Sequence, residues 1–190
     1  RRRHTRFRNV TGVQTCALPI YLFDIVAPDG TGYRESNTYG AGDQVVTYQA
    51  DGVTVGCAIC YDLRFPELFQ ELMRRGAKVI ALPSSFTLQT GKDHWETLCR
   101  ARAIETETYF LACDQWGTFK AGDGGTRHTY GHSLMVDPWG HVIARASDGV
   151  GIISARLDIG RVDKIRSEIP LIDHKVVGVG GKIQKTKVAA

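Results

Sequence analysis

The amino-acid sequence predicts a layered α/β fold. Short runs of β-branched and other apolar residues alternate along the chain with segments that carry helix start and stop signals, and this alternation is typical of helices packed on a sheet. The chain has 190 residues, of which 43% are hydrophobic and 23% are charged, so it is long enough for one domain with a sizeable core. No internal repeat, domain linker or membrane-spanning apolar run is visible.

The predicted elements follow one another closely along the chain. In order they are a long loop over Tyr21–Asp43, a hairpin of strands Val45–Ala50 and Val53–Cys60, a helix over Pro66–Arg75, a buried strand over Lys78–Leu82, a helix from Asp93 to about Glu107, a buried strand over Tyr109–Cys113, a Gly-rich loop over Gly117–Thr126, strands Ser133–Val136 and Val142–Ala146, a strand over Val150–Leu157 that closes the sheet, and a helix over Ile159–Ser167. Beyond Pro170 the composition predicts an extended or partner-dependent tail.

Local signals define the first elements. The segment after Tyr21 is rich in Gly, Pro, Asp and Asn, which favour loops. Asp51-Gly52 lies between two β-branched runs and is typical of a hairpin turn. Pro66 suits the first position of a helix, and Gly76 suits the position just after its end. These signals predict a hairpin followed by one short helix.

Similar signals define the later elements. Asp93 with Glu96 resembles a capping box in which Asp replaces Ser or Thr, so we expect a helix to begin there. The sequence Asp137-Pro138-Trp139-Gly140 predicts a tight turn between two strands. Asp158 can accept hydrogen bonds from the first turn of a helix, and it therefore predicts the start of the last one.

The amino-terminal segment differs from the rest of the chain. The net charge is +4, and residues 1–20 contain no acidic residue. Five arginines lie in this segment: Arg1, Arg2, Arg3, Arg6 and Arg8. Because it lacks helical or strand periodicity, we interpret residues 1–20 as a spurious or foreign segment and the chain as a C-terminal fragment. An arginine-rich arm that binds nucleic acid is the alternative interpretation.

Cys60 is the candidate nucleophile. It ends an apolar run that predicts a buried strand and precedes the predicted helix, so it lies at the carboxyl edge of the sheet, where ligands bind in open α/β folds. A thiol requires a nearby base to act as a nucleophile at neutral pH. The candidate bases are Glu35, His94, His128 and His132, and their spacing does not choose among them.

The five cysteines indicate free thiols in a reducing compartment, because their spacing is uneven and one lies inside an apolar strand. Cys57 and Cys60 form a Cys-x-x-Cys pair, but residues three apart in a strand face opposite sides of the sheet. We therefore expect neither a metal site nor a redox pair. Cys57, Cys99 and Cys113 are interpreted as small buried hydrophobic residues.

The segment 56–68, GCAICYDLRFPEL, resembles the nucleophile motif of the nitrilase superfamily of carbon–nitrogen hydrolases. Further similar segments are 22–24 LFD, 33–36 YRES, 82–87 LPSSFT, 94–96 HWE, 100–105 RARAIE and 130–140 YGHSLMVDPWG. The sequence is most similar to the Nit branch, which includes amidases that act on deaminated glutathione and related ω-amides. The resemblance implies a nitrilase-type αββα sandwich with its N-terminal part missing, a hydrolase domain over residues 21–174, a tail over 175–190, and no cofactor.

The resemblance also implies a mechanism. Cys60 would attack the amide carbon and form a thioester, ammonia would leave, and water would regenerate the thiol. The Tyr61 N–H would donate to the oxyanion, and Glu35 matches a supporting glutamate of the family. The family's triad lysine corresponds to Pro19, and its base glutamate lies upstream of this sequence. We therefore expect the 190-residue chain to be a poor catalyst or inactive.

The remaining predicted site residues support the nucleophile or the substrate. We expect Arg64 to pair with Glu67 beside the nucleophile, and Arg102 to pair with Glu105 one helical turn away. Asp62 belongs to the same supporting set. The polar loop Phe86–Asp93, with Phe86 and Thr87, and the Gly-rich loop are expected to shape substrate selection, with Arg127 as a partner for a substrate carboxylate.

The sequence leaves three functional readings to compare. The first is a cytoplasmic amidase that binds a small-molecule amide, forms a homodimer, and contacts neither nucleic acid nor membrane. The second is a cysteine hydrolase of another type, in which His132 or His94 activates Cys60. The third is a non-enzymatic domain that binds nucleic acid through its arginine-rich arm, with strongly salt-dependent affinity.

Overall fold

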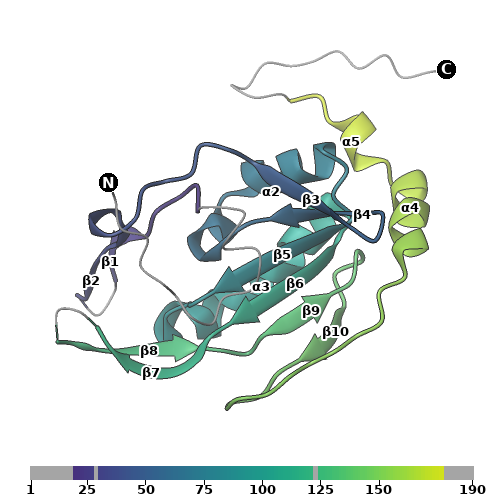
Figure 1. Cartoon of the computed structure of the whole chain (residues 1–190). Coiled ribbons are helices and arrows are strands. Elements are labelled where there is room, and N and C mark those ends of the chain that lie inside the picture. The colour runs from purple at the N-terminus through teal and green to yellow at the C-terminus, as the bar shows by residue number, and fades with distance from the viewer. Residues whose placement is uncertain (1–18, 28–29, 122–123, 178–190) are drawn as a thin grey trace.

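The computed structural model describes residues 19–27, 30–121 and 124–177. Its centre is a six-stranded sheet in the order β10-β9-β6-β5-β4-β3 (Figure 1). The strands of this sheet are β3 (Val46–Ala50), β4 (Val53–Cys57), β5 (Val79–Ser84), β6 (Tyr109–Asp114), β9 (Leu134–Val136) and β10 (Val142–Arg145). The three central strands β4, β5 and β6 are parallel, and the outer strands are antiparallel to their neighbours. The α/β prediction is confirmed.

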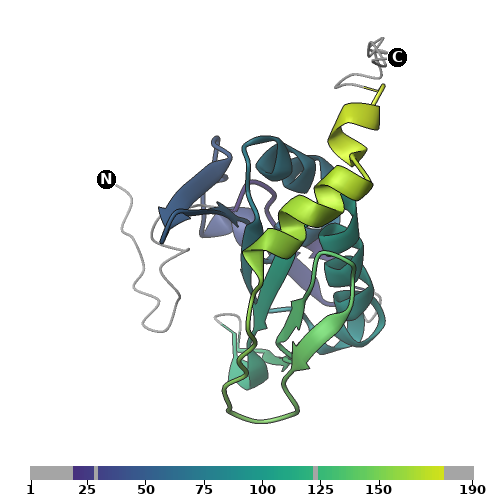
Figure 2. The ribbon, with the colours of Figure 1, turned by 90° about the vertical axis from the view of Figure 1, so that its right-hand side faces the viewer.

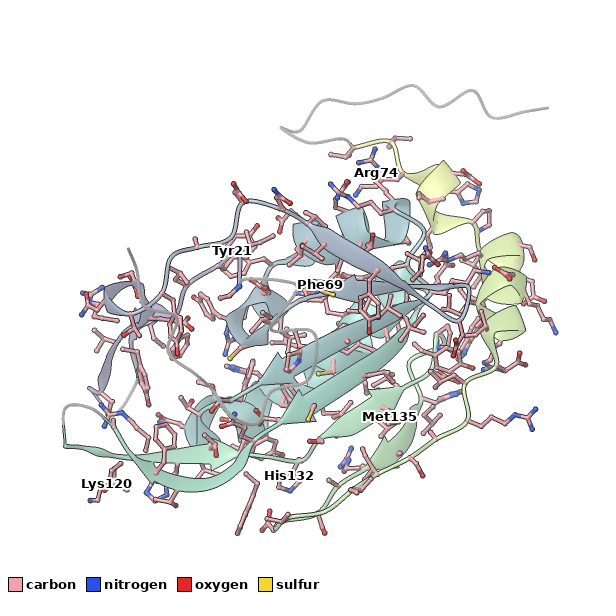
Figure 3. All side chains as sticks on the ribbon, viewed as in Figure 1. Tyr21, Phe69, Arg74, Lys120, His132 and Met135 are labelled. Carbon is pink, nitrogen blue, oxygen red and sulfur yellow. The ribbon has the colours of Figure 1, made fainter. Side chains whose placement is uncertain are left out.

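Two helices connect the parallel strands and cover one face of the sheet. They are α2 (Pro66–Arg74) and α3 (Leu88–Thr106), and they lie on the same side in both views (Figures 1 and 2). Helix α2 has Pro66 in its first turn, and Gly76 follows its end with a φ of +84°, as the sequence predicted. Its Phe69 points into the core, with its ring 5.7 Å from that of Phe110 in β6 (Figure 3).

The opposite face of the sheet is only partly covered. Helix α4 (Ile159–Glu168) is capped by the Asp158 carboxylate, which accepts from Gly160 N at 3.1 Å, as predicted. Its Val162 packs against the first residues of the parallel strands, namely Val55, Val79 and Tyr109. Further along β5 and β6, Ala81 and Leu111 are half-buried and Cys113 is exposed, and Met135 in the neighbouring strand β9 is also half-buried. This face therefore carries apolar side chains that the described residues leave uncovered.

Cys113 corrects one prediction, because it lies on the open part of this face and is exposed rather than buried. Cys57 and Cys99 are buried as expected, and Cys57, Cys60, Cys99 and Cys113 are all free thiols. The described residues contain no cluster of three His, Cys, Asp or Glu side chains arranged to hold a metal ion. Within the same residues no helix combines the length and apolar character needed to cross a bilayer.

Two segments predicted as loops contain paired strands. The segment 21–43 forms the hairpin β1 (Asp24–Val26) and β2 (Gly32–Arg34), followed by the short 3-10 helix η1 (Glu35–Asn37). The Gly-rich segment belongs to a second hairpin, β7 (Trp116–Lys120) and β8 (Thr126–Tyr130). Each hairpin forms a two-stranded sheet outside the central one, and β8 also bridges Thr87 through Thr129.

Helix α3 begins at Leu88, so the capping box predicted at Asp93 is wrong and most of the predicted polar loop is helical. Thr87, in an extended conformation, precedes the first turn. The helix tolerates Gly91 because that residue packs against Tyr130, whose Cβ would lie 2.3 Å from an added Cβ. Tertiary contact therefore extends the helix over residues with weak local signals.

The carboxyl-terminal elements also differ from expectation. The segment 150–157 forms no strand, and Val150 and Ile152 are fully exposed, because no neighbouring strand pairs with it. A short helix α5 (Leu171–His174) lies where an extended tail was predicted. Of the predicted foreign segment 1–20, only Pro19 and Ile20 are among the described residues. Of the predicted tail 175–190, only residues 175–177 are.

Candidate active site

Cys60 lies where the chain leaves the carboxyl end of β4. The strand ends at Cys57, three residues earlier than predicted, and Cys60 is the first residue of the 3-10 helix η2 (Cys60–Arg64). Its φ is +48°, a left-handed conformation that is unfavourable for a residue with a side chain. The half-buried thiol lines a pocket whose walls are Phe23, Tyr61, Arg64, Ser85, Phe86, Thr87 and Thr90.

Asp62 fixes the turn that contains the nucleophile. Its carboxylate, 1% exposed, accepts from Ile59 N at 2.9 Å, from Ile20 N at 3.0 Å and from Tyr21 N at 2.9 Å. Burial raises the pKa of Asp62 to about 6, against the lowering effect of these three donors. Asp62 therefore ties residues 20–21 to the turn, where the Tyr21 ring also stacks on Phe65 at 3.6 Å (Figure 3).

Arg102, in helix α3, supports the same turn. Its Nε donates to the carbonyl oxygen of Leu63 at 2.9 Å, and its Nη1 donates to Glu105 at 3.0 Å. The guanidinium is buried and lies over the ring of Phe69 at 5.5 Å. Burial raises the pKa of Glu105, and the charge of Arg102 opposes that rise. The geometry agrees with the Arg102–Glu105 pair predicted from their helical spacing.

Arg64 has a different environment from the one predicted. No ion pair joins it to Glu67, although both residues are described, and Glu67 is exposed. The guanidinium instead lies over the rings of Tyr61 at 6.0 Å and Phe86 at 5.5 Å, and its Nη1 is 3.3 Å from Nδ1 of His94. The aromatic walls therefore hold Arg64 along the pocket, where it is a cation available to a bound anion.

Glu35, the first residue of η1, acts on the thiol through its charge. Its Oε2 accepts from Phe23 N at 2.7 Å, and its charge is one of those that raise the pKa of Cys60. The ring of Phe23 contacts that of Tyr61 at a centroid distance of 5.0 Å. The residues that flank the β1–β2 hairpin, Phe23 before β1 and Glu35 after β2, therefore bring an aromatic wall and a carboxylate near the nucleophile.

The thiol is neutral at physiological pH. Burial raises the pKa of Cys60 to about 12, and the charges of Asp114, Glu35 and Asp62 add to that rise. A backbone hydrogen bond from Ser85 acts in the opposite direction. Because the thiolate is the attacking species, such a thiol needs a base that removes its proton during the reaction.

The remaining predicted residues lie farther from the thiol. Arg127, in β8, lies over the ring of Tyr33 at 5.4 Å and is not among the residues that line the pocket. His132 stacks on Tyr130 next to β9 (Figure 3). Among the described residues no hydrogen bond joins Cys60 to His94, His128 or His132, so the geometry does not favour a Cys–His pair.

Four residues near the thiol were absent from the predicted set. Phe23 and Thr90 line the pocket, Ser85 hydrogen-bonds the sulfur, and Asp114 acts on it electrostatically. Ser85 follows β5 and Asp114 ends β6. A search for polar residues at the carboxyl ends of all predicted parallel strands, rather than at one strand, would have indicated both.

Comparisons with known proteins agree with this geometry. The family model described as carbon-nitrogen hydrolase matches residues 20–167. The chain belongs to the carbon-nitrogen hydrolase family. The resemblance to the nitrilase superfamily is thereby confirmed, and the curated relatives are named deaminated glutathione amidase.

Three similar proteins illustrate the relationship. The deaminated glutathione amidase of Synechocystis is 42% identical over 159 residues, which cover 83% of this chain and 57% of the relative. The crystal structure of the Caenorhabditis elegans NitFhit protein is similar with a TM-score of 0.75 and 40% identity, over 83% of this chain and 37% of that one. Nit3 of Saccharomyces cerevisiae, described as a member of branch 10 of the nitrilase superfamily, has a TM-score of 0.66 and 35% identity, over 75% and 55%. The chain spans about half the length of the curated relatives it matches.

Proposed function

We propose that this sequence forms the nucleophile-bearing part of an amidase that hydrolyses a small linear amide through a Cys60 thioester. The observation that carries the proposal is the position of Cys60, which has a left-handed backbone at the mouth of an aromatic-walled pocket. Such a position turns one reactive atom toward the pocket and places backbone N–H groups beside it. The names of the curated relatives support an ω-amide of the deaminated glutathione type as the substrate.

In the proposed reaction a base removes the proton from the Cys60 thiol as the sulfur attacks the amide carbon. The new C–S bond gives a tetrahedral oxyanion, to which the Tyr61 N–H donates. The C–N bond then breaks, the nitrogen leaves as ammonia with the transferred proton, and water cleaves the thioester to a carboxylic acid and the free thiol. Glu35 positions the substrate amide beside the sulfur, since its carboxylate is near enough for its charge to act on the thiol.

Substrate recognition is assigned to the pocket walls and the adjoining hairpin. Phe86 and Thr87 contact the linear part of the substrate, because both line the pocket. Arg127 is proposed as the partner of a substrate carboxylate farther from the sulfur, where a guanidinium can form paired hydrogen bonds with it. This division predicts that Arg127→Lys raises KM for an acidic ω-amide more than it lowers kcat.

Residues 1–190 alone are expected to hydrolyse amides slowly. The family's lysine corresponds to Pro19, which carries no charge, so the oxyanion lacks that cation. Removal of one member of a group that acts together can abolish most of the rate enhancement. We expect amide turnover by the 190-residue chain to be lower by at least roughly 1000-fold than that of a relative with the complete triad.

The test measures ammonia release from an acidic ω-amide by the protein in its natural length. Cys60→Ala should lower kcat by roughly 1000-fold or more, because no other group forms the thioester. Cys113→Ala is the matched control, since Cys113 is a free thiol outside the pocket, and it should retain activity. Full activity of Cys60→Ala would refute the proposed nucleophile, and parental turnover by residues 1–190 would refute the expected slow hydrolysis by this chain.

Two further expectations complete the proposal. The natural-length protein is expected to be a cytoplasmic homodimer, and sedimentation at several concentrations would reveal a monomer if the assembly is wrong.

Nucleic-acid binding through the arginine-rich arm concerns residues 1–18, which lie outside the described residues. Deletion of that arm should leave amide turnover unchanged.

A further inference from the structure

Asp114 is the last residue of β6. In the sheet, β5 separates β6 from β4, the strand that leads to Cys60. The Asp114 side chain is 6% exposed, and its Oδ1 accepts from Phe86 N at 2.8 Å. Its backbone is fixed as well, because Asp114 N donates to Ser133 Oγ at 2.9 Å, and that hydroxyl donates back to Asp114 O at 3.2 Å. Asp114 is therefore a rigid anchor for the residues after β5.

The anchored backbone is the same stretch that touches the nucleophile. Phe86 N binds Asp114, and the preceding residue, Ser85, provides the backbone hydrogen bond to the Cys60 sulfur. The Phe86 carbonyl in turn accepts from Tyr130 N at 2.9 Å. One carboxylate thus controls where the Ser85 N–H points, and that N–H is the group that favours the thiolate.

The second oxygen of Asp114 has an unusual environment. Asp114 Oδ2 and Ser84 Oγ are both buried and find no hydrogen-bond partner among the described residues. Ser84 is directly opposite Asp114 in the β5–β6 register, so the two polar atoms come from neighbouring positions on one face of the sheet. A buried polar atom without a protein partner is costly to stability, so this part of the sheet edge is unusually polar for a buried site.

We propose that Asp114 is a positioning residue for Cys60: it holds the Ser85–Phe86 backbone beside the sulfur, and its negative charge disfavours the thiolate. The inference rests on the proposed role of Cys60 as nucleophile, and it adds a residue that acts on the thiol without contacting substrate. The two effects of Asp114 oppose each other, since the anchored N–H favours the thiolate and the charge disfavours it.

The pH range of the charge effect follows from the environment of Asp114. Burial raises its pKa to about 7, against backbone hydrogen bonds from Phe86, Gly131 and Gln115. Three other ionisable groups belong to this region. The charge of Asp114 also raises the pKa of Cys99 in α3, and the charges of Glu35 and Asp62, like that of Asp114, raise the pKa of Cys60. Asp114 should therefore suppress the thiolate above about pH 7 and lose that effect below it.

The test uses the 190-residue chain and alkylation of Cys60 by iodoacetamide, followed by peptide mass spectrometry. Asp114→Asn keeps an oxygen for Phe86 N, and its amide NH2 replaces Oδ2 opposite Ser84, so only the charge is lost. We expect alkylation at pH 8 to be roughly two- to fivefold faster than in the parent, since a larger thiolate fraction outweighs lower nucleophilicity. At pH 6 the two rates should agree.

Asp114→Ala separates anchoring from charge. It removes both, so its Cys60 should react more slowly than that of Asp114→Asn at pH 8, although both lack the charge. Asp137→Asn is the matched control, because Asp137 is also buried at the end of a strand and accepts backbone N–H groups from Trp139 and His141, outside the residues that line the pocket.

Circular dichroism establishes that each variant is folded, and the readout does not depend on amide turnover. Equal Cys60 alkylation by the parent and Asp114→Asn at pH 8 would overturn the charge effect. Equal rates for Asp114→Asn and Asp114→Ala would overturn the anchoring effect. A failure of Cys60→Ala to abolish turnover would instead refute the proposed function and leave these alkylation results intact.

Discussion

Arg102 in α3 donates to the carbonyl oxygen of Leu63, 39 residues earlier in the chain, with an Nε–O distance of 2.9 Å. The turn that begins with Cys60 is therefore held by Arg102, which does not line the pocket itself. Arg102 is 6% exposed, and a charged hydrogen bond at such a site is difficult for water to replace. The conformation of the nucleophile depends on this buried contact.

Arg102→Met should lower the free energy of unfolding by about 2–4 kcal/mol, because the Leu63 carbonyl and Glu105 lose their buried partner. Urea denaturation measures the loss, and amide hydrogen exchange should accelerate in residues 60–65. Arg100→Met is the control, since Arg100 also donates its Nε to a backbone carbonyl, that of Gly140, but is exposed. It should cost less than about 1 kcal/mol. Equal losses for the two variants would show that burial of Arg102 has no special effect.

Gly91→Ala should destabilise the protein although alanine is the better helix former. In an exposed helix the change would stabilise by about 1 kcal/mol, but here the added Cβ would lie 2.3 Å from the Cβ of Tyr130. The overlap should cost about 1–3 kcal/mol and displace the first turn of α3 from β8. The change in urea midpoint gives the sign. A stabilised variant would mean that the contact between α3 and β8 is loose in solution.

Asp62 should make the stability of the chain depend on pH. Its pKa is raised to about 6 by burial, above the value of about 4 in an unfolded chain. Its contribution to stability is therefore fully present below about pH 4 and is lost as the pH rises through about 6. The parent should lose roughly 1–3 kcal/mol relative to Asp62→Asn between pH 4.5 and pH 7.5. A stability difference that stays constant over this interval would contradict the raised pKa.

The free thiols should react with iodoacetamide in an order set by exposure and charge. Cys113 is exposed and should react first, whereas Cys57 and Cys99 are buried and should react only on unfolding. Cys60 should be slow at pH 7.5, because burial raises its pKa to about 12, and its rate should rise about tenfold for each pH unit toward that value. Rapid labelling of Cys60 at neutral pH would indicate that the site ionises more easily than its burial implies.

Elements with local signals could be predicted from the sequence, and elements made by tertiary contact could not. Helix α2 carries Pro66 at its start and Gly76 after its end, and the Asp158 cap precedes α4, so both were predicted within a few residues. The start of α3 depends on the fit of Gly91 against Tyr130, which is 39 positions away. The apolar alternation of residues 150–157 resembles a strand, but a strand also requires a neighbour to pair with.

The candidate site shows the same division. Cys60 could be predicted because one apolar run ends at it, and Arg102 with Glu105 because their spacing matches one helical turn. Arg64 was expected to pair with Glu67 beside the nucleophile, but its guanidinium lies over the rings of Tyr61 and Phe86 instead. Asp114 was missed because only the strand that leads to Cys60 was searched for site residues, whereas Asp114 ends β6, two strands away in the sheet.

Because Cys60 has a left-handed backbone, the residue needed for the reaction also lowers the thermal stability of the protein. A non-glycine residue in this conformation carries strain of roughly 1–2 kcal/mol, which glycine would release. In a library of position-60 variants selected only for survival of heating, glycine should therefore become the most frequent residue. Selection for turnover should return cysteine, even though every molecule that carries it melts at a lower temperature.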